Sequence, residues 1–366
     1  MSNRIGIAVI GCGLVGAHRA RTAAADRRTA LRLVIDNQPQ RAARLAAAYD
    51  VDASADWRSA LSREDIGAVV ISTPNALLVP IGVAALRSGR HVLIEKPMGR
   101  NATEGRALAA EARRAGTVLK VGFRHRYRES LVRAREMVRS GAVGRLIQLR
   151  ARYGYGARAE HEKEWRADAE LAGGGALLDE GVHIVDLFHW FAGPAQRAQA
   201  ELQTAVWDLG RLEDNAFGML RFAAGVVGQF HVGTTEWKNL FSFEVRGDAG
   251  AIHVEGLGGS YGPESLVHTR RAEGAGEASV ERSGFEDNDA SWAEEWSDFA
   301  AALHGERLRH GAAEDGLQVL TVQCTRKVAP LLRPGRIVVL ESAPLDRGLT
   351  GALGTSRVDE RFRTVA

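Results

Sequence analysis

A glycine-rich turn near the start of the chain limits what this sequence can fold into more than any other feature. An apolar run at residues 4–10 leads into Gly11-Cys12-Gly13-Leu14-Val15-Gly16, and an Ala-rich helical pattern follows over residues 16–25. In such a strand–turn–helix unit, the first glycine permits the tight turn, the second lets a ligand approach the backbone, and the third lets helix and strand pack closely. The start of the helix then offers free N–H groups and a partial positive charge to a phosphate.

An acidic residue follows where a dinucleotide would need it. Asp36 comes directly after a second apolar run, at residues 31–35, and lies twenty positions beyond Gly16. A carboxylate there can accept hydrogen bonds from ribose hydroxyls. The predicted cofactor residues in this part of the chain are Gly11, Gly13, Leu14, Val15, Gly16 and Asp36. The carboxylate favours NAD, because it would repel a 2′-phosphate, and the nearby Arg41 leaves NADP as an alternative.

The first third of the chain alternates strand and helix patterns. Strands are predicted at residues 4–10, 31–35, 68–72, 91–94 and 117–122, and helices at 16–25, 39–49, 78–88 and 102–115. This alternation predicts an α/β fold with a doubly wound parallel sheet and helices on both of its faces.

From about residue 146 short strands joined by Gly-containing turns replace this alternation. Strands are predicted at residues 146–153, 216–222, 226–233, 241–246 and 251–255, and helices at 176–191, 292–304 and 316–331. The hairpin spacing indicates a mainly antiparallel sheet. We therefore divide the 366 residues into a dinucleotide-binding domain at 1–123, a second α/β domain at 124–342 and a polar tail at 343–366.

Composition excludes several classes of protein. The formal net charge of +3 is scattered along the chain, whereas nucleic-acid binding needs a concentrated basic face. The two cysteines, Cys12 and Cys324, lie too far apart in sequence to suggest a disulfide framework, and alone they cannot form a zinc site. No apolar run approaches a membrane span or a secretory leader, so we expect a cytoplasmic protein without membrane contact.

A charged pair follows the strand predicted at residues 91–94. Glu95-Lys96-Pro97 falls at the carboxyl end of that strand, which is the edge where doubly wound sheets bind ligands. The proline after it holds Lys96 in an extended conformation and so fixes its direction. A lysine fixed at a ligand-binding edge is suited to exchange a proton with the ligand. A solvated lysine at a strand end is the alternative.

A mostly apolar helix predicted at residues 176–191 carries a polar stripe. Asp179, His183 and Asp186 follow the spacing that stacks side chains on one helix face. His183 is suited to take or give a hydroxyl proton, and Asp179 to orient it and bind the substrate. A structural histidine is one alternative, and a metal site of His183, Asp186 and His189 is another. We expect no metal, because the spacing lacks the His-x-x-x-His face of a zinc helix.

Together these motifs resemble the glucose–fructose oxidoreductase / inositol dehydrogenase / rhizopine-catabolism (Gfo/Idh/MocA) family. The glycine turn, Glu95-Lys96-Pro97 and the stretch from Gly173 to Asp186 carry the resemblance, in this order along the chain. It implies a Rossmann domain followed by an α/β domain with an open, mainly antiparallel sheet. It also implies that Lys96, Asp179 and His183 are catalytic and grip the substrate, and that the open sheet packs against a partner's to give a homodimer or homotetramer.

The resemblance extends to further contacts. Ser72-Thr73-Pro74-Asn75 matches the family segment that lies along the cofactor, and Glu95 belongs to the same edge. Lys163-Glu164-Trp165-Arg166 is similar to members that act on surface-polysaccharide sugars. Tryptophan can cover the apolar face of a sugar, and arginine can bind hydroxyls or a carboxylate. The further residues predicted to contact substrate are Arg124, Arg152, Tyr155, Trp165 and Arg166.

These observations predict an NAD(P)-dependent dehydrogenase that oxidises a ring hydroxyl of a sugar, sugar derivative or cyclitol. The cluster of Arg124, Arg152 and Arg166 favours an anionic sugar. An NAD-dependent glycosidase or epimerase, in which the redox step is transient, is one alternative. A non-catalytic nucleotide-sensing protein is the other.

Overall fold

Apolar segments in the first third of the chain form a parallel sheet of six strands in the order β3-β2-β1-β4-β5-β6. The computed structural model describes residues 4–157, 159–272, 276–286, 289–323 and 337–340. The strands of this first sheet are β1 (Ile5–Ile10), β2 (Thr29–Ile35), β3 (Asp52–Ser54), β4 (Ala68–Ile71), β5 (His91–Ile94) and β6 (Leu119–Val121). Every residue of β4 is buried, as expected for a central strand that is covered on both faces.

The order of the strands reverses between β1 and β4, which are neighbours in the sheet although β2 and β3 separate them in sequence. Ligands of doubly wound sheets bind outside the carboxyl ends of the strands at such a reversal. Because β1 leads into the glycine turn and β4 leads into Ser72, these two segments meet at this edge. The helices between its strands cover this sheet or its rim: α1 (Leu14–Ala25), α2 (Pro39–Tyr49), α3 (Ser59–Ser62), α4 (Asn75–Arg87) and α5 (Ala102–Ala115).

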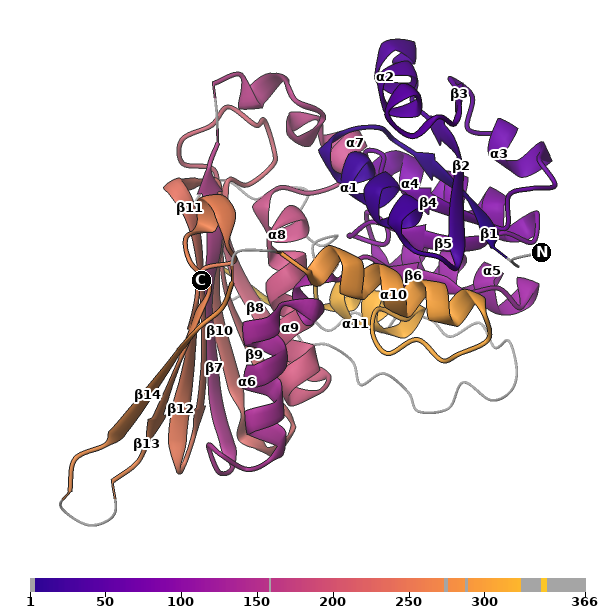
Figure 1. Ribbon diagram of the computed structural model, residues 1–366. Coiled ribbons are helices and arrows are strands. Elements are labelled where there is room, and N and C mark those ends of the chain that lie inside the picture. The colour runs from indigo at the N-terminus through magenta and orange to yellow at the C-terminus, as the bar shows by residue number, and fades with distance from the viewer. Residues whose placement is uncertain (1–3, 158, 273–275, 287–288, 324–336, 341–366) are drawn as a thin grey trace.

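A second sheet has nine strands in the order β14-β13-β12-β11-β7-β10-β9-β8-β15, and its one parallel pair in the described part of the chain is β7 with β10. Its strands are β7 (Leu146–Gly156), β8 (Ala195–Gln203), β9 (Asn215–Phe222), β10 (Val227–Gly233), β11 (Thr235–Gly247), β12 (Gly250–Glu255), β13 (Ser265–Arg270), β14 (Ser279–Gly284) and β15 (Ile337–Leu340). Figure 1 shows the two sheets side by side, with the first sheet drawn in indigo and purple on the right.

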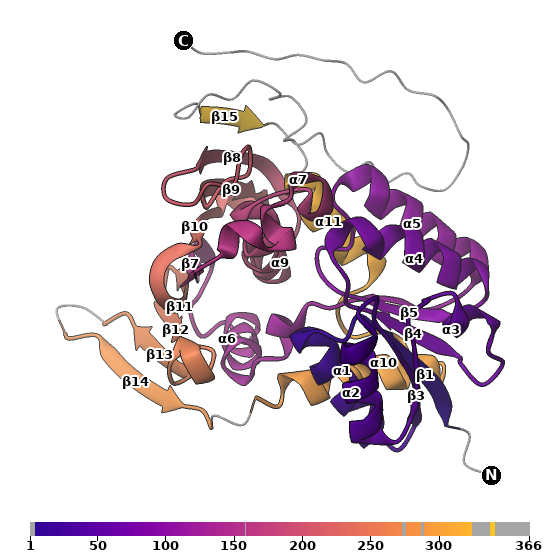
Figure 2. The same cartoon turned by 90° about the horizontal axis from the view of Figure 1, so that it is seen from above.

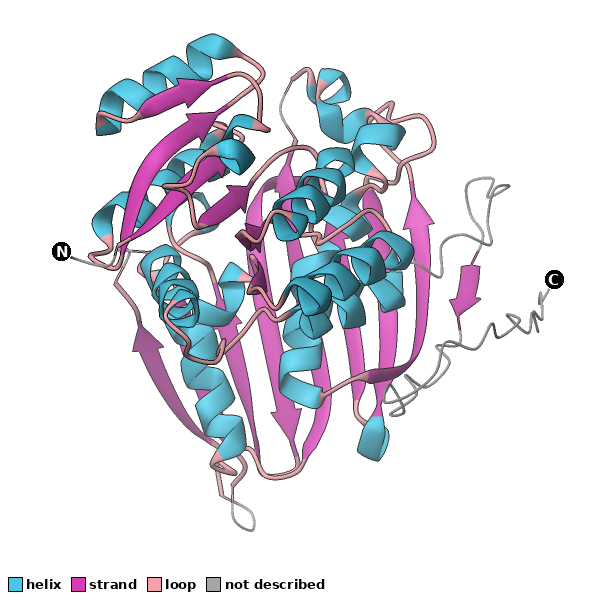
Figure 3. Cartoon of the chain, turned by 90° about the vertical axis from the view of Figure 1, so that its right-hand side faces the viewer, coloured by secondary structure: helices cyan, strands magenta, loops and turns pink. Residues whose placement is uncertain are grey.

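In the described part of the chain, helices cover only one face of the second sheet (Figure 1 and Figure 3). They include α6 (Glu129–Arg139), α8 (Ala176–Asp179) and α9 (Gly181–Ala192), while α7 (Ala169–Ala172) packs on α4 of the first domain. Burial alternates along β9, where Ala216, Leu220 and Phe222 face the helices. Phe217 and Met219, on the other side of the same strand, stay exposed. This alternation is the pattern of a sheet with one bare face.

The last two described helices return to the first sheet. α10 (Ser291–Leu303) contacts α1, and its Trp296 and Phe299 share a hydrophobic core with Ile7 and Val9 of β1. α11 (Ala313–Gln323) contacts α5, which covers the first sheet, and α9, which covers the second, and therefore joins the two domains (Figure 2). The division at residue 123 stays a prediction, and the structure adds that α10 completes the core of the first sheet.

A buried arginine ties three of these elements together. The guanidinium of Arg19, on α1, donates to Glu95 after β5 at 2.7 Å and to Glu295 on α10 at 2.6 Å. Both Arg19 and Glu295 are fully buried, so their charges are sheltered from water. The contact fixes Glu95, and with it the chain that leads into Lys96.

The α/β class and the two sheets predicted from sequence are confirmed, and residues 39–49, 91–94 and 102–115 have the predicted bounds. The single helix predicted at 176–191 is wrong, because the chain breaks between α8 and α9 at Glu180. Part of the helix predicted at 316–331 and the tail at 343–366 lie outside the described residues, as does Cys324. No helix among the described residues combines the length and apolarity that crossing a membrane requires, and a cytoplasmic location stays a prediction.

We expect Arg19→Met to lower the free energy of unfolding by about 3–5 kcal/mol, because Glu295 and Glu95 would keep buried charges without their partner. Arg63→Met is the matched control. Arg63 pairs with Asp52 and Asp65 at the surface, where the loss should stay within about 1 kcal/mol. Urea unfolding of both variants measures the difference. Equal losses would contradict a stabilising role for the buried network.

Candidate active site

The glycine turn has the geometry that the sequence predicted. Gly11 has a φ of +94°, and a Cβ there would lie 2.4 Å from the carbonyl oxygen of Ser72. A Cβ on Gly16 would lie 1.7 Å from the carbonyl oxygen of Gly11, so only glycine lets α1 start this close to β1. A Cβ on Gly13 would meet nothing within 4 Å. The turn therefore leaves open space beside Gly13, where a ligand can reach the backbone.

The start of α1 suits a phosphate group. No side chain caps this helix end, so the first N–H groups of α1 remain available. Leu14 lies there with 79% of its surface exposed, which is unusual for a leucine beside a domain core. Free N–H groups, the helix dipole and the open space at Gly13 fit the pyrophosphate of a dinucleotide. Val15 belongs to the same first turn.

Asp36 is fixed directly beside the glycine turn. Its carboxylate accepts hydrogen bonds from the backbone N–H groups of Cys12 and Gln38, both at 2.8 Å. These contacts hold a negative charge at the end of β2, where ribose hydroxyls of a dinucleotide bound to the turn would lie. The arrangement fits NAD, as the sequence suggested.

The residues of the segment after β4 lie at this edge, but their side chains have different partners. Ser72 donates from its Oγ to the carbonyl oxygen of Gly11 at 3.0 Å, and Thr73 and Pro74 are half-buried beside it. Asn75 is buried, and its side-chain amide donates to the carbonyl oxygen of Ala172 at 2.8 Å. The side chain of Asn75 thus ties the first domain to α7, which differs from the cofactor contact predicted for it.

Lys96 and Asp179 meet across the two domains. The Nζ of Lys96, after β5, donates to the carboxylate of Asp179 at 2.8 Å and to its backbone carbonyl oxygen at 2.7 Å. Arg166 donates from Nε to the other carboxylate oxygen at 2.7 Å. Two of the catalytic residues predicted from sequence are therefore in direct contact, and a predicted substrate residue joins them.

The charges around Asp179 keep it ionised. Burial alone would raise the pKa of its carboxyl, but Lys96 and Arg166 hold that pKa well below its usual range. The sequence predicts that Asp179 orients His183, but in the structure its carboxylate binds Lys96 and Arg166 instead. Asp179 therefore fixes Lys96 and Arg166 in place.

His183 lies on α9, one turn beyond the helix break. Its Nδ1 lies 2.7 Å from Nδ1 of His125, and the two ring centroids are 4.0 Å apart. Burial, followed by the charges of Lys96 and Arg124, holds the pKa of His183 well below its ordinary value. The ring is therefore neutral at physiological pH, with one nitrogen carrying a proton and the other accepting one.

Asp186 does not share the site, although the sequence placed it on the same helix face. Its carboxylate accepts two hydrogen bonds from the guanidinium of Arg126, at 2.6 and 2.9 Å. Burial raises the pKa of Asp186 to about 7 against the opposing effect of Arg126. Among the described residues no three His, Cys, Asp or Glu side chains gather as metal ligands, and His183 and Asp186 have the separate partners given above.

Tyrosines from β7 and from the connection between β12 and β13 line the same region. Tyr153 contacts both His125 and His183 edge-on, and Tyr261 lies 5.6 Å from Tyr153 between ring centroids. Tyr155, predicted from sequence, stands two residues further along β7, and burial followed by the nearby Glu180 raises its pKa. Tyr153 and Tyr261 were not predicted. The alternation of β7 could have suggested Tyr153, because it shares a face with Tyr155.

Glu180, at the break between α8 and α9, is a second unpredicted group. Its side chain is buried, and its Oε2 has no hydrogen-bond partner among the described residues. Burial, followed by the neighbouring carboxylate of Asp179, raises the pKa of Glu180 well above its usual value. Its surroundings therefore favour the protonated form of Glu180.

Two predicted residues have structural partners at the rim of the site. Glu95 is bound by Arg19, as described above. Arg124 pairs with Asp289 at 3.0 Å and lies over the ring of Trp292. Its charge still lowers the pKa of His183, although less than burial and Lys96 do. Arg124 thus affects the site electrostatically while its side chain is held by the segment before α10.

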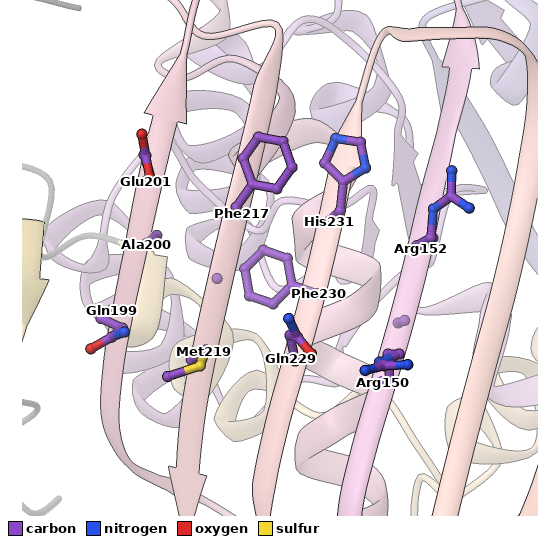
Figure 4. Close-up of a pocket in the computed structure, with 12 residues that line it drawn as sticks. Arg150, Arg152, Gln199, Ala200, Glu201, Phe217, Met219, Gln229, Phe230 and His231 are labelled. Carbon is purple, nitrogen blue, oxygen red and sulfur yellow. The ribbon is translucent and has the colours of Figure 1, made fainter. Parts of the chain in front are cut away.

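Arg152 is a correction to the predicted site. It lies on the bare face of the second sheet (Figure 4) with 55% of its side chain exposed. It pairs with Glu236 at 3.2 Å. Because side chains alternate along β7, Arg152 points away from Tyr153 and from the helices. Trp165 does lie near the site, where the guanidinium of Arg166 covers its ring at 4.5 Å.

Both domains match known sequence families. Residues 5–123 match the oxidoreductase family with an NAD-binding Rossmann fold, and residues 131–253 match the GFO/IDH/MocA C-terminal domain. The chain is 28% identical over 248 residues to levoglucosan dehydrogenase of Pseudarthrobacter phenanthrenivorans, covering 60% of this chain and 64% of that protein. It is 33% identical over 214 residues to 1,5-anhydro-D-fructose reductase of Ensifer adhaerens, covering 57% and 63%. The matches thus span slightly less than two thirds of both relatives.

A solved structure supports the same assignment over nearly the whole chain. The crystal structure of GenD2 from gentamicin A biosynthesis, in complex with NAD, shares 26% identity with a TM-score of 0.78. The superposition covers 93% of this chain and 97% of that one. Because the two domains match their counterparts in order along a single chain, this protein belongs to the Gfo/Idh/MocA family of oxidoreductases, and its first domain is an NAD-binding Rossmann domain.

Proposed function

We propose that this protein is an NAD-dependent dehydrogenase that oxidises a ring hydroxyl of a sugar or sugar derivative. The single observation that carries the proposal is the contact between Lys96 and Asp179, beside His183, at the carboxyl edge of the NAD-binding sheet. A lysine and a neutral histidine together can bind a hydroxyl oxygen and exchange its proton. Sugar-specific enzymes among the relatives support the substrate class.

Each group at the site has a distinct task. Bound NAD supplies the hydride acceptor for the carbinol carbon. Lys96 and His183 hold the hydroxyl oxygen so that its proton can leave, while Asp179 keeps Lys96 oriented. Arg166 and Trp165 offer hydrogen bonds and a flat apolar surface to the rest of the ring.

The positive charge of Arg166 favours a substrate with an anionic group. Arg166 donates only its Nε to Asp179 at 2.7 Å, and its NH1 lies at 3.8 Å from Glu164. A guanidinium that is partly engaged in this way keeps donors for a carboxylate or phosphate on the substrate. We therefore favour a uronate or a nucleotide sugar over a neutral polyol.

We also propose that two copies pair through the bare face of the second sheet. Phe217 and Met219 expose 44% and 43% of their surfaces there, and Phe217 stacks on His231 (Figure 4). The hollow around them is also lined by Arg150, Arg152, Gln199, Glu201 and Gln229. A patch with an apolar centre and both signs of charge at its rim is self-complementary about a two-fold axis.

We expect Lys96→Met and His183→Asn each to lower kcat/KM by about 10²- to 10⁴-fold, because each removes a group that exchanges or binds the hydroxyl proton. The assay follows NADH formation with uronates, nucleotide sugars and neutral sugars. Lys163→Met, at an exposed pair with Glu160, is the control and should keep full activity. Activity that survives replacement of both Lys96 and His183 would overturn the proposal, and turnover without net NADH would favour a glycosidase or epimerase.

We expect Asp36→Ala to weaken NAD binding by about 10- to 100-fold, the usual effect of losing a hydrogen bond to a charged group, and to narrow the preference for NAD over NADP. Titration calorimetry with both dinucleotides measures the two changes. Asp56→Asn is the matched control, because its carboxylate is exposed and pairs with Arg58. A variant that binds NAD as tightly as the wild type would remove Asp36 from the cofactor site.

Phe217→Glu should shift the protein towards monomers, because it places a charge in the centre of the proposed contact. Sedimentation velocity at several concentrations gives the distribution of species. Leu77→Glu is the control, since Leu77 is 44% exposed on α4, far from the bare face. A wild-type protein that is monomeric throughout, or an unchanged assembly in Phe217→Glu, would exclude this interface.

A further inference from the structure

His125 is a buried titratable residue that the proposed chemistry does not use. It lies in the short helix Arg124–Tyr127 after β6 and is 1% exposed. Its ring stacks on Phe241 with centroids 5.9 Å apart and stands edge-on to His183 and Tyr153. Contacts on several sides hold the ring in one orientation, with Nδ1 aimed at Nδ1 of His183.

The contact between the two histidines can hold only one proton. At 2.7 Å, one Nδ1 must donate and the other must accept. Neither ring can carry both protons, because each is buried and each has cations nearby: Lys96 and Arg124 for His183, and these two with Arg128 for His125. Two neutral tautomers of the pair therefore remain.

The surroundings of His125 choose between these tautomers. Its Nε2 is buried without a hydrogen-bond partner among the described residues. If His183 were the donor, this Nε2 would carry a proton with nothing to accept it, next to three cations. If His125 is the donor, Nε2 is an unprotonated lone pair, which the nearby positive charges stabilise. The second arrangement therefore has the lower free energy.

We propose that His125 is a positioning residue that donates from Nδ1 to His183 and so fixes His183 as the Nε2–H tautomer. This inference rests on the proposed function and refines it. With its Nδ1 occupied as an acceptor, His183 presents an N–H to the substrate oxygen. It then binds and polarises that oxygen. Lys96 first releases one ammonium proton to water, and the resulting amine takes the hydroxyl proton in oxidation and returns it in reduction.

The direct test is the tautomer of His183 in the full-length protein, read from ¹⁵N shifts and long-range ¹H–¹⁵N correlations after ¹⁵N-histidine labelling. The signal of His183 is identified by its absence from His183→Asn. We expect the Nε2–H pattern in the wild type, and a mixture of tautomers or the Nδ1–H form in His125→Leu. His125→Asn keeps an amide donor at the same place and should retain the Nε2–H form.

Kinetics supply a second readout. His125→Leu should lower kcat by about 10- to 100-fold, a scale typical of partners that orient a functional histidine, with KM nearly unchanged, and His125→Asn should recover part of the loss. If His125→Leu does not fold, His125→Phe keeps the stack on Phe241 and takes its place. An Nδ1–H tautomer of His183 in the wild type would overturn the proposal. So would a His125→Leu variant in which both the tautomer of His183 and kcat equal those of the wild type. Because the NMR measurement needs no turnover, it separates this result from a failure of the proposed reaction.

Discussion

The ion pair between Lys96 and Asp179 is the interaction on which the whole site depends. Lys96 comes from the edge of the parallel sheet and Asp179 from the end of α8, so this contact of 2.8 Å joins the two domains at the site. Asp179 is buried and would be costly to ionise alone, yet Lys96 and Arg166 keep it charged. The same carboxylate thereby positions the amine and the guanidinium to which we assign proton exchange and substrate binding.

Much of this arrangement could be predicted from local patterns in the sequence. The spacing of Gly11, Gly13 and Gly16 determines a backbone geometry, and strand–helix alternation determines a parallel sheet, because both depend on neighbouring residues. Partners that lie far apart in sequence could not be predicted. Nothing local pairs His125 with His183 across 58 positions, or directs Asp179 to Lys96 across 83.

Two of the errors have local physical causes. A stripe of Asp179, His183 and Asp186 requires one straight helix, but the helix is interrupted at Glu180, which separates Asp179 from His183. Asp186 stays on the same helix as His183 and pairs with Arg126. The prediction for Arg152 rests on residue type alone, although alternation along β7 places it on the face opposite Tyr155. A charged residue between two tyrosines of one strand must face the other way, so the strand period is a better guide than the chemistry of the side chain.

The electrostatics of the pocket decide how the histidine pair can act. Cations from both domains lie near the two rings, while the carboxylate of Asp179 is bound to Lys96 and Arg166 rather than to His183. A histidine next to a carboxylate can become an imidazolium during a reaction, because the negative charge stabilises it. His183 has an imidazole as its Nδ1 partner, so its charged form gains no such support. In the proposed reaction, proton exchange therefore falls to the amine form of Lys96. The histidine pair would supply a fixed neutral N–H, which stabilises charge on the substrate oxygen without itself changing protonation.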